Sequence, residues 1–298
     1  RGKMMKVGFI GLGIMGYHMA CNLSKSGYQV YVYDIMPEAV KRTEKSGCIG
    51  CASIKEVVGQ CDDIITMLPN GPHVKSVVLG DGGIAEFGNR GTFIIDMSSI
   101  APEVSREIAE RLNQKGIHMM DAPVSGGEPK AADGTLAIMA GGCQEDFERA
   151  SKYFDILGAS AILVGNVGSG NTCKLTNQMI VAVNIAALSE GLQLAARAGA
   201  DVEKVYEAIK GGLAGSAVMN AKAPMMLDGN YKPGFKIDLH IKDLTNAMET
   251  GYATHTPMPL TAQVMQMFQV LKADGCGQED HGALIKYYQK LTGTDVAQ

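Results

Sequence analysis

Residues Lys6–Gly16 read KVGFIGLGIMG, and this stretch decides the fold of the first part of the chain. An apolar run typical of a buried strand leads into a glycine pattern that opens a helix. In such a turn the first glycine permits tight bending, the second lets a pyrophosphate approach the backbone, and the third lets helix and strand pack closely. A glycine-rich turn without a ligand is the alternative. The pattern predicts a dinucleotide site at Gly11, Leu12, Gly13, Ile14, Met15 and Gly16.

Further apolar runs alternate with helical stretches up to residue 165. The predicted strands are Lys6–Ile10, Gln29–Tyr33, Asp63–Met67, Thr92–Ile95, Ile117–Met120, Leu136–Ala140 and Ala161–Val164. Near-continuous apolar strands that alternate with helices are typical of a parallel sheet covered on both faces. The run Leu136–Ala140 follows only a short turn, so we expect it to join the sheet antiparallel.

From about Asn171 onward the strand pattern disappears. A long helix is expected to run to Arg197, and Asp201 is expected to cap the next one. We therefore predict an α/β fold in two domains. Residues 1–165 form a Rossmann-type, doubly wound dinucleotide-binding domain, and residues 166–298 form an all-α domain for substrate binding and oligomerisation.

The cofactor preference depends on Asp34, which ends the second predicted strand. A carboxylate at this distance from the glycines accepts hydrogen bonds from a ribose 2′-hydroxyl and repels a 2′-phosphate. The alternative role is a cap for the helix that begins near Pro37. Ile35 and Met36 supply no cation, so NAD is favoured, while Lys41 and Arg42 leave the use of NADP open.

Two other strand ends are expected to face the cofactor, because the carboxyl ends of parallel strands border the ligand crevice. One is the run Met67, Leu68, Pro69 and Asn70. The other includes Ser98 and Ser99, which follow the fourth predicted strand; a turn that starts the Pro102 helix explains both serines equally well.

Small residues and one lysine indicate where the chemistry takes place. Ser125, Gly126 and Gly127 follow a strand and offer backbone N–H groups and a hydroxyl to a substrate carboxylate; an ordinary glycine loop is the alternative. Lys174 lies near the start of the long helix, and Asn177 and Gln178 share its face. A lysine on an otherwise apolar face needs a reason, because burial of an unpaired ammonium is costly. It can polarise a carbonyl and donate a proton; a solvated lysine is the alternative.

Lys242 is ambiguous from spacing alone. It could pair with Asp238 one helical turn away, which stabilises a helix by only about 0.3–0.5 kcal/mol. The functional interpretation is that Lys242 reaches toward the cofactor or toward Lys174.

Composition limits the partners. Hydrophobic residues make up 46% of the chain and the formal net charge is −4, so a packed core is expected and no nucleic-acid surface is indicated. The apolar stretch 179–196 carries polar side chains and reads as a buried helix, so no membrane is expected. Seven cysteines without a regular framework suit a reducing cytoplasm. Cys48 and Cys51 form a lone CxxC with no second pair or suitably spaced histidines nearby, and the six histidines show no ligand spacing of their own, so no metal is expected. Apolar faces left to cover favour a homo-oligomer, a dimer or tetramer.

The glycine pattern, Asp121–Gly127, the run Gly168–Lys174 and Lys242–Leu244 resemble, in order and over essentially the whole chain, the β-hydroxyacid dehydrogenase family. The resemblance implies that Lys174 is catalytic, that Ser125–Gly127 hold a substrate carboxylate, and that Lys242 contacts the cofactor. Where the family commonly has Asn, this chain has Gln178, so either Asn177 or Gln178 orients the substrate.

Within the family, Ser125–Ala131, Lys174–Gln178 and Pro233–His240 are most similar to members that reduce tartronate semialdehyde (2-hydroxy-3-oxopropionate) to glycerate. Alternative activities are those of a 3-hydroxyisobutyrate dehydrogenase or of a broad glyoxylate and succinic semialdehyde reductase. An NAD-binding regulator without catalysis is the alternative from another class.

Overall fold

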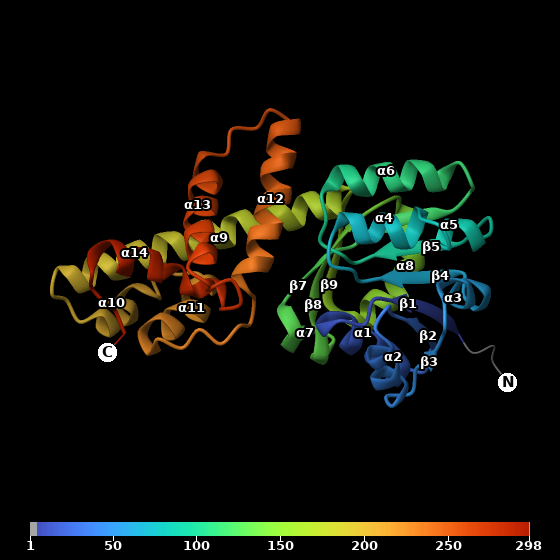
Figure 1. Cartoon of the computed structure of the whole chain (residues 1–298), viewed down its shortest axis with the longest axis horizontal. Coiled ribbons are helices and arrows are strands. Elements are labelled where there is room, and N and C mark those ends of the chain that lie inside the picture. Colours follow the sequence, from blue (N-terminus) through green and yellow to red (C-terminus); the bar gives the residue numbers. More distant parts are fainter. Residues whose placement is uncertain (1–4, 298) are drawn as a thin grey trace. The chain divides into compact units, whose positions relative to one another are not determined.

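A computed structural model of the chain describes residues 5–297 (Figure 1). By compactness the chain divides into two units, one ending at Lys174 and the other beginning at Leu175. All the strands lie in the first unit, and the described part of the second is helical. The predicted fold class, a Rossmann-type sheet followed by an all-α region, is confirmed. The architecture changes after Gly165, where the last strand ends, whereas the compact units divide within the helix that follows.

The first unit is built on one nine-stranded sheet. Its strands are β1 (Lys6–Ile10), β2 (Gln29–Tyr33), β3 (Ile49–Gly50), β4 (Asp63–Thr66), β5 (Phe93–Asp96), β6 (His118–Asp121), β7 (Val124–Ser125), β8 (Leu136–Gly141) and β9 (Gly158–Gly165). They lie in the order β3-β2-β1-β4-β5-β6-β8-β7, and β9 pairs with β8. The chain leaves β1 toward β2 on one side and returns to β4 on the other. The carboxyl ends of β1 and β4 therefore flank the switch point where such sheets bind ligands.

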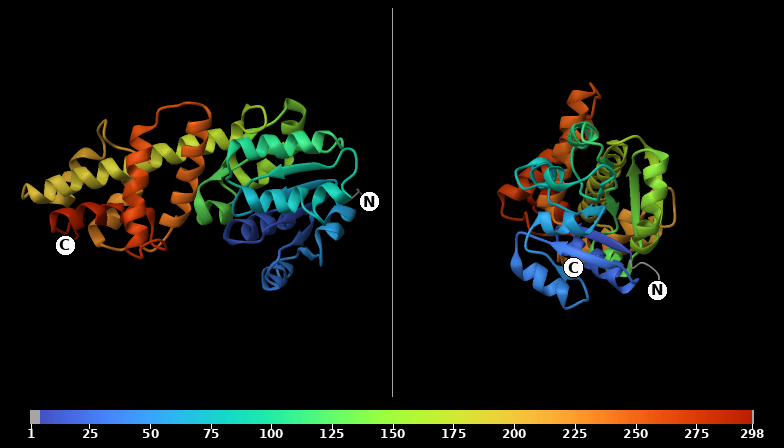
Figure 2. Two further views of the ribbon diagram at one scale, coloured as in Figure 1. Left: turned by 45° about the horizontal axis from the view of Figure 1, so that its top comes forward. Right: turned by 90° about the vertical axis from the view of Figure 1, so that its right-hand side faces the viewer.

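Helices cover both faces of this sheet (Figure 2). They are α1 (Ile14–Lys25), α2 (Pro37–Glu44), α3 (Ile54–Gln60), α4 (Gly71–Leu79), α5 (Ile84–Phe87), α6 (Pro102–Asn113), α7 (Gly127–Asp133) and α8 (Gln144–Leu157). Successive strand residues point to opposite faces, so Ile64 and Ile94 enter the core under α3, α4 and α6, and Ile65 and Ile95 enter the core under α1 and α8. Burial on both faces explains why the strands read as continuous apolar runs.

The second unit contains most of a long helix and several shorter ones. These are α9 (Ser169–Arg197), α10 (Val202–Ile209), α11 (Ala217–Asp228), α12 (Ile237–Ala253), α13 (Pro259–Ala273), the 3₁₀ turn η1 (His281–Leu284) and α14 (Ile285–Thr292). One core, which includes Ile185 and Leu192 of α9, holds them together. By length and composition α9 could cross a membrane, a test that core helices of soluble proteins also pass.

Three local features depart from the sequence-based predictions. Residues 121–127, predicted as a loop, contain β7, which pairs antiparallel with β8, and Gly127 begins α7. The strand β3 and the helix α11 were not predicted; α11 contains Pro224, which usually argues against a helix interior. The expected antiparallel entry of Leu136–Gly141 is confirmed by its pairing with β6 and β7.

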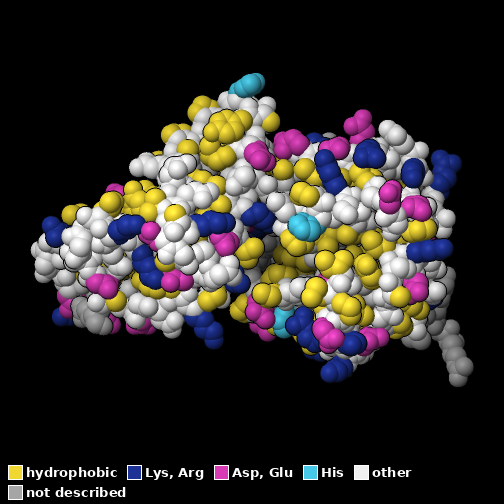
Figure 3. Space-filling model, viewed as in Figure 1, with side chains coloured by type: hydrophobic (Ala, Val, Ile, Leu, Met, Phe, Trp, Pro, Cys, Tyr) yellow, Lys and Arg dark blue, Asp and Glu magenta, His cyan; other side chains and the backbone are white. Residues whose placement is uncertain are grey.

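The surface carries both signs of charge. On the face shown in Figure 3, basic and acidic side chains are interspersed over each unit. This agrees with a net charge of −4, and no single basic field covers this face.

Candidate active site

The three glycines of the turn between β1 and α1 occupy three different environments. Gly11 has φ +97°, and a side chain there would collide with the carbonyl of Met67 in the neighbouring β4 loop. Gly16 packs against the Gly11 carbonyl. A Cβ at Gly13, in contrast, would meet nothing within 4 Å. There is therefore no room for a side chain at the first and third glycines. The backbone at the second is accessible, as needed for a pyrophosphate to approach it.

Asp34 is tied directly to this turn. Its Oδ2 accepts a hydrogen bond from Leu12 N (2.7 Å), and its Oδ1 accepts one from Met36 N (2.8 Å). Met36, not Asp34, is the N-cap residue of α2, so Asp34 does not cap this helix as the alternative interpretation supposed. The carboxylate stands beside the glycine turn, where a ribose hydroxyl would be bound.

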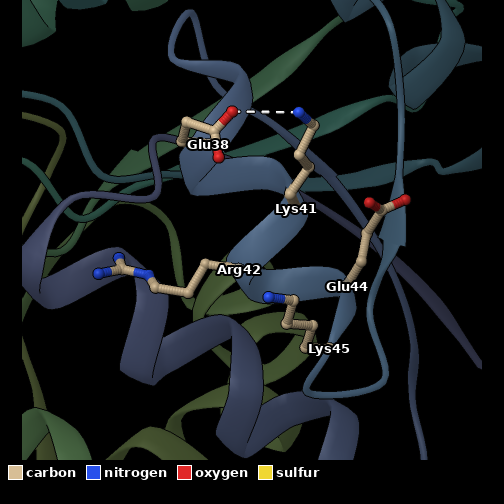
Figure 4. Close-up of a pocket in the computed structure, with 5 residues that line it drawn as sticks. All are labelled: Glu38, Lys41, Arg42, Glu44 and Lys45. Atoms are coloured by element: carbon tan, nitrogen blue, oxygen red, sulfur yellow. Dashed lines mark hydrogen bonds and ion pairs between the residues drawn. The ribbon is translucent and has the colours of Figure 1, made fainter.

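The two basic residues that left the use of NADP open behave differently. Lys41 pairs with Glu38 (3.1 Å), whereas Arg42 leaves α2 on another side (Figure 4). Arg42 donates to the Leu12 carbonyl (3.1 Å) and lies 4.0 Å from the centre of the Tyr17 ring. Only Arg42 of this pair is hydrogen-bonded to the glycine turn.

The loops after β4 and β5 are joined by a buried serine. Ser98 Oγ donates to Asp96 Oδ1 (2.6 Å) and accepts from Leu68 N (2.8 Å). This link holds the predicted cofactor loop, in which Met67, Leu68 and Asn70 are half-buried and Pro69 is exposed. Of the two serines that the sequence pointed to, Ser98 is buried and Ser99 is half-buried.

Two buried carboxylates stand side by side at this edge of the sheet, because Asp96 of β5 and Asp121 of β6 are paired in register. Burial raises the pKa of each to about 6, against the hydrogen bonds that each accepts. Asp121 Oδ1 accepts from Gly168 N (2.6 Å), and its Oδ2 accepts from Asn171 N (2.7 Å). Asp121 therefore fixes the backbone at the start of α9.

Asn171 makes the second connection at the start of α9. Its side chain accepts from Ile100 N (3.0 Å) and donates to Ser105 Oγ (3.1 Å), and the residue is fully buried. Lys174 follows one helical turn later and is itself only 6% exposed. The solvated lysine that spacing allowed is thus excluded. The lysine that the sequence singled out is carried by a turn held at three points of the first unit.

The predicted substrate loop is partly open to solvent. Ser125 and Gly127 are half-buried and Gly126 is exposed. Gly126 and Gly127 have φ +138° and +68°, values that glycine adopts readily and other residues rarely do. Consecutive residues of this kind can turn successive N–H groups toward one anion.

In the second unit the two candidate amides are hydrogen-bonded to each other, and one of them has a further partner. Gln178 is buried; its Oε1 accepts from Asn177 (2.9 Å) and its Nε2 donates to Asp243 (2.7 Å). Asp243 in turn lies 3.0 Å from the ammonium of Lys242. The Asp238–Lys242 pair considered from spacing is replaced, because Asp238 pairs with Lys272 (3.1 Å).

Sequence reasoning did not single out Asp96, Asn171, Asp243 or the buried His240. A carboxylate that ends an apolar strand was a usable signal for Asp96. Asn171 and Asp243 lie next to recognised motifs, but their partners are distant in sequence and could not be inferred from spacing. Among the described residues, no group of three or more His, Cys, Asp or Glu side chains is placed to hold a metal ion.

Two family models match consecutive parts of the chain. The NAD binding domain of 6-phosphogluconate dehydrogenase matches residues 6–167, and the NAD-binding domain of NADP-dependent 3-hydroxyisobutyrate dehydrogenase matches residues 168–288. These matches and the glycine turn agree on NAD(P) as the cofactor.

Individual relatives span the whole chain. The 2-hydroxy-3-oxopropionate reductase of Escherichia coli is 41% identical over 98% of this chain and 100% of its own length. The 2-(hydroxymethyl)glutarate dehydrogenase of Eubacterium barkeri is 38% identical over 99% and 98%. A solved 3-hydroxyisobutyrate dehydrogenase of Mycobacterium tuberculosis, with L-serine, has a TM-score of 0.91 at 30% identity and covers 96% of this chain and 100% of its own. The chain is therefore an NAD(P)-dependent oxidoreductase that belongs to the β-hydroxyacid dehydrogenase family.

Proposed function

We propose that this protein reduces tartronate semialdehyde to glycerate, with Lys174 as the proton donor. The observation that carries the mechanism is a lysine only 6% exposed, one helical turn after a backbone segment that Asp121 and Asn171 fasten to the edge of the sheet. Burial of an ammonium is costly, so a lysine in this position needs a reason, and proton donation to a growing alkoxide is one that a positioned lysine can supply. The full-length relative at 41% identity supports the choice of substrate.

Each part of the candidate site has its own role in this proposal. The substrate carboxylate binds at Ser125, Gly126 and Gly127. Bound NADH or NADPH supplies the hydride that adds to the aldehyde carbon. Lys174 stabilises the negative charge on the oxygen and transfers a proton to it, so that the product is the alcohol.

Asn177, Gln178 and Lys242 position the substrate and the cofactor. Asn177 orients the substrate and Gln178 orients Asn177, because both polar ends of the Gln178 side chain are already hydrogen-bonded. Lys242 contacts the cofactor. Asp34 favours NADH, and Arg42 beside the glycine turn tolerates NADPH.

The proposal extends to the location and the assembly of the protein. We expect a cytoplasmic homo-oligomer, in keeping with seven free cysteines in the described chain.

A substrate panel tests the activity. Turnover of tartronate semialdehyde, methylmalonate semialdehyde, glyoxylate and succinic semialdehyde is measured with NADH and with NADPH. We expect the highest kcat/KM for tartronate semialdehyde with NADH. A clear preference for methylmalonate semialdehyde would instead indicate a 3-hydroxyisobutyrate dehydrogenase, which the structural similarity at TM-score 0.91 makes the second candidate. Failure to oxidise NADH with any member would favour a non-catalytic regulator.

Replacement of Lys174 tests the mechanism. Lys174→Ala should lower kcat by about 10²–10⁴-fold, the usual contribution of a general acid, while NADH binding measured by fluorescence persists. Lys25→Ala, which removes an exposed lysine at the end of α1, is the matched control and should keep its turnover. Near-wild-type turnover in Lys174→Ala would show that another group donates the proton.

A further inference from the structure

Two buried histidines of the second unit touch each other and have no part in the proposed function so far. His240 of α12 is 0% exposed and His281 of η1 is 6% exposed, and their Nδ1 atoms are 2.8 Å apart. Phe235 packs against both rings, with centroids 5.7 and 5.2 Å away. A contact between two imidazole nitrogens requires one of them to donate and the other to accept.

The surroundings determine which nitrogen donates. His240 Nε2 lies 3.0 Å from the carbonyl oxygen of Gln178, and a carbonyl can only accept, so Nε2 carries a hydrogen. In a neutral His240 the Nδ1 atom is then an acceptor, and His281 Nδ1–H must be the donor. An imidazolium at His240 would be a buried charge, which is costly. Asp280 Oδ1 lies 4.0 Å from His281 Nε2, beyond hydrogen-bond distance, so the bonds between the two rings and to Gln178 favour this one arrangement of protons.

His281 is held by the residue before it. Asp280 is fully buried and its carboxylate accepts from Lys222 Nζ (2.7 Å). It also accepts from three backbone N–H groups, those of Gly234 (2.9 Å), Phe235 (3.0 Å) and Gly282 (2.8 Å). These bonds fix the start of η1 and the loop before α12, so the ring of His281 is presented to His240 in one orientation.

His240 in turn acts on Gln178. The Gln178 carbonyl receives the His240 N–H, and the Gln178 side chain is bound by Asn177 and Asp243. His240 and Asp243 lie one turn apart on α12. This helix is therefore hydrogen-bonded to both the backbone and the side chain of Gln178 on α9. Asp243 also pairs with Lys242 (3.0 Å).

We propose that His281 and His240 are positioning residues for the reduction: the His281 N–H orients His240, His240 holds Gln178, and Gln178 sets the side chains of Asn177 and, through Asp243, of Lys242. This inference rests on the proposed function, in which Asn177 orients the substrate and Lys242 contacts the cofactor.

Paired substitutions at His281 separate the N–H group from the bulk of the ring. His281→Phe keeps an aromatic ring beside Phe235 but cannot donate, whereas His281→Asn keeps an N–H close to the place of Nδ1. Loss of one buried hydrogen bond predicts that His281→Phe lowers kcat/KM for the best substrate roughly 5- to 20-fold. His281→Asn should remain within about threefold of wild type, since it restores the donor. Wild-type kcat/KM in His281→Phe, or equal losses in both variants, would overturn the proposal.

A matched control comes from an exposed histidine. His255 has φ +54°, which Asn tolerates, so His255→Asn should leave kcat/KM unchanged.

A spectroscopic measurement on the wild-type protein tests the proton arrangement without turnover. Two-dimensional ¹⁵N–¹H spectra of the imidazole rings, assigned with His281→Asn and His240→Gln, should show His240 protonated at Nε2 and His281 at Nδ1. The opposite tautomer at either ring would overturn the proposal even if the variants fold poorly. The same spectrum of Lys174→Ala should be unchanged at these rings. An active Lys174→Ala with the expected tautomers would contradict the proposed mechanism, not this proton arrangement.

Discussion

At the scale of single residues, Asp63 and Asp96 show how differently one side-chain type can be used on neighbouring strands. Both are buried, and burial alone raises a carboxyl pKa. The Asp63 carboxylate accepts hydrogen bonds from Tyr153 (2.6 Å) and Lys152 (2.9 Å) and pairs with Arg149. Together these three side chains lower the pKa of Asp63 below its ordinary value. Asp96 receives only hydroxyl and backbone donors, and its pKa rises to about 6. Asp63, whose charge is balanced by cations, lies at the start of β4. Asp96, which has no cationic partner among its hydrogen bonds, lies at the end of β5 that borders the candidate site.

The raised pKa of Asp96 predicts a specific dependence of stability on pH. A carboxyl whose folded pKa exceeds its unfolded value of 3.8 binds its proton more tightly in the folded state. Its cost to stability is therefore absent below pH 3.8, grows as the pH rises through about 6, and is complete above that, at no more than roughly 3 kcal/mol.

Asp96→Asn tests this residue. The amide oxygen still accepts from Thr66 and Ser98, but the group no longer ionises. The free energy of unfolding is measured in urea from pH 5 to pH 8 for both proteins. The value for the variant minus the value for the wild type should increase as the pH rises. Asp155→Asn, at an exposed position of α8, is the control and should show no such trend. Parallel curves for wild type and Asp96→Asn would contradict the prediction.

At the scale of elements, the start of α9 is the segment on which the mechanism depends. Gly170 has no room for a side chain, because a Cβ there would lie against the carbonyl oxygens of Met139 and, at 2.8 Å, of Asp121. Gly141 of β8 is equally confined, with its Cβ position 2.6 Å from Gly170 N. Helix and sheet therefore approach at backbone distance just before Lys174, and any residue larger than glycine would move the lysine.

Two glycine substitutions in the same helix should have opposite effects. Gly170→Ala overpacks the start of α9, so it should destabilise the protein by ~1–3 kcal/mol and lower kcat. Gly191→Ala meets nothing within 4 Å and removes backbone entropy from a helix interior, so it should stabilise by ~0.5–1 kcal/mol and keep kcat. Thermal unfolding and steady-state turnover of both variants measure this. A Gly170→Ala enzyme with wild-type kcat would show that the close packing does not position Lys174.

At the scale of the whole molecule, large apolar side chains remain exposed on the described helical unit. Ile180 is 57%, Leu194 71% and Leu260 63% exposed. Contiguous exposed apolar area marks interaction surfaces in soluble proteins, and Ile180 and Leu194 share the helix α9. It supports the expectation that copies of the chain associate.

Light scattering coupled to size-exclusion chromatography tests the assembly. The mass should be two or four times 31.5 kDa, and the double variant Ile180→Glu/Leu194→Glu should shift it toward a single chain, because buried carboxylates oppose association. Ile35→Glu, at an 80% exposed residue of the sheet unit, should leave the mass unchanged. A wild-type mass of 31.5 kDa would show that these side chains face water.

Local patterns sufficed for much of the fold. The strands Lys6–Ile10 and Gln29–Tyr33 have the bounds that their apolar periodicity predicts. The run Ser53–Glu56 has the sequence pattern of a capping box, and Ser53 caps α3 by accepting from Glu56 N (3.3 Å). The strand β3 was missed because two residues carry too little periodicity to detect.

The sequence by itself determined the alternation of strands and helices, the glycine turn with Asp34 and the presence of a lysine near the start of the long helix, because periodicity and turn chemistry act between residues close along the chain. Only the tertiary structure decided which buried polar groups meet. Gly168 donates to Asp121 from 47 residues away, and His281 reaches His240 across 41. A buried polar side chain must find a partner, but which partner it finds depends on how the elements pack.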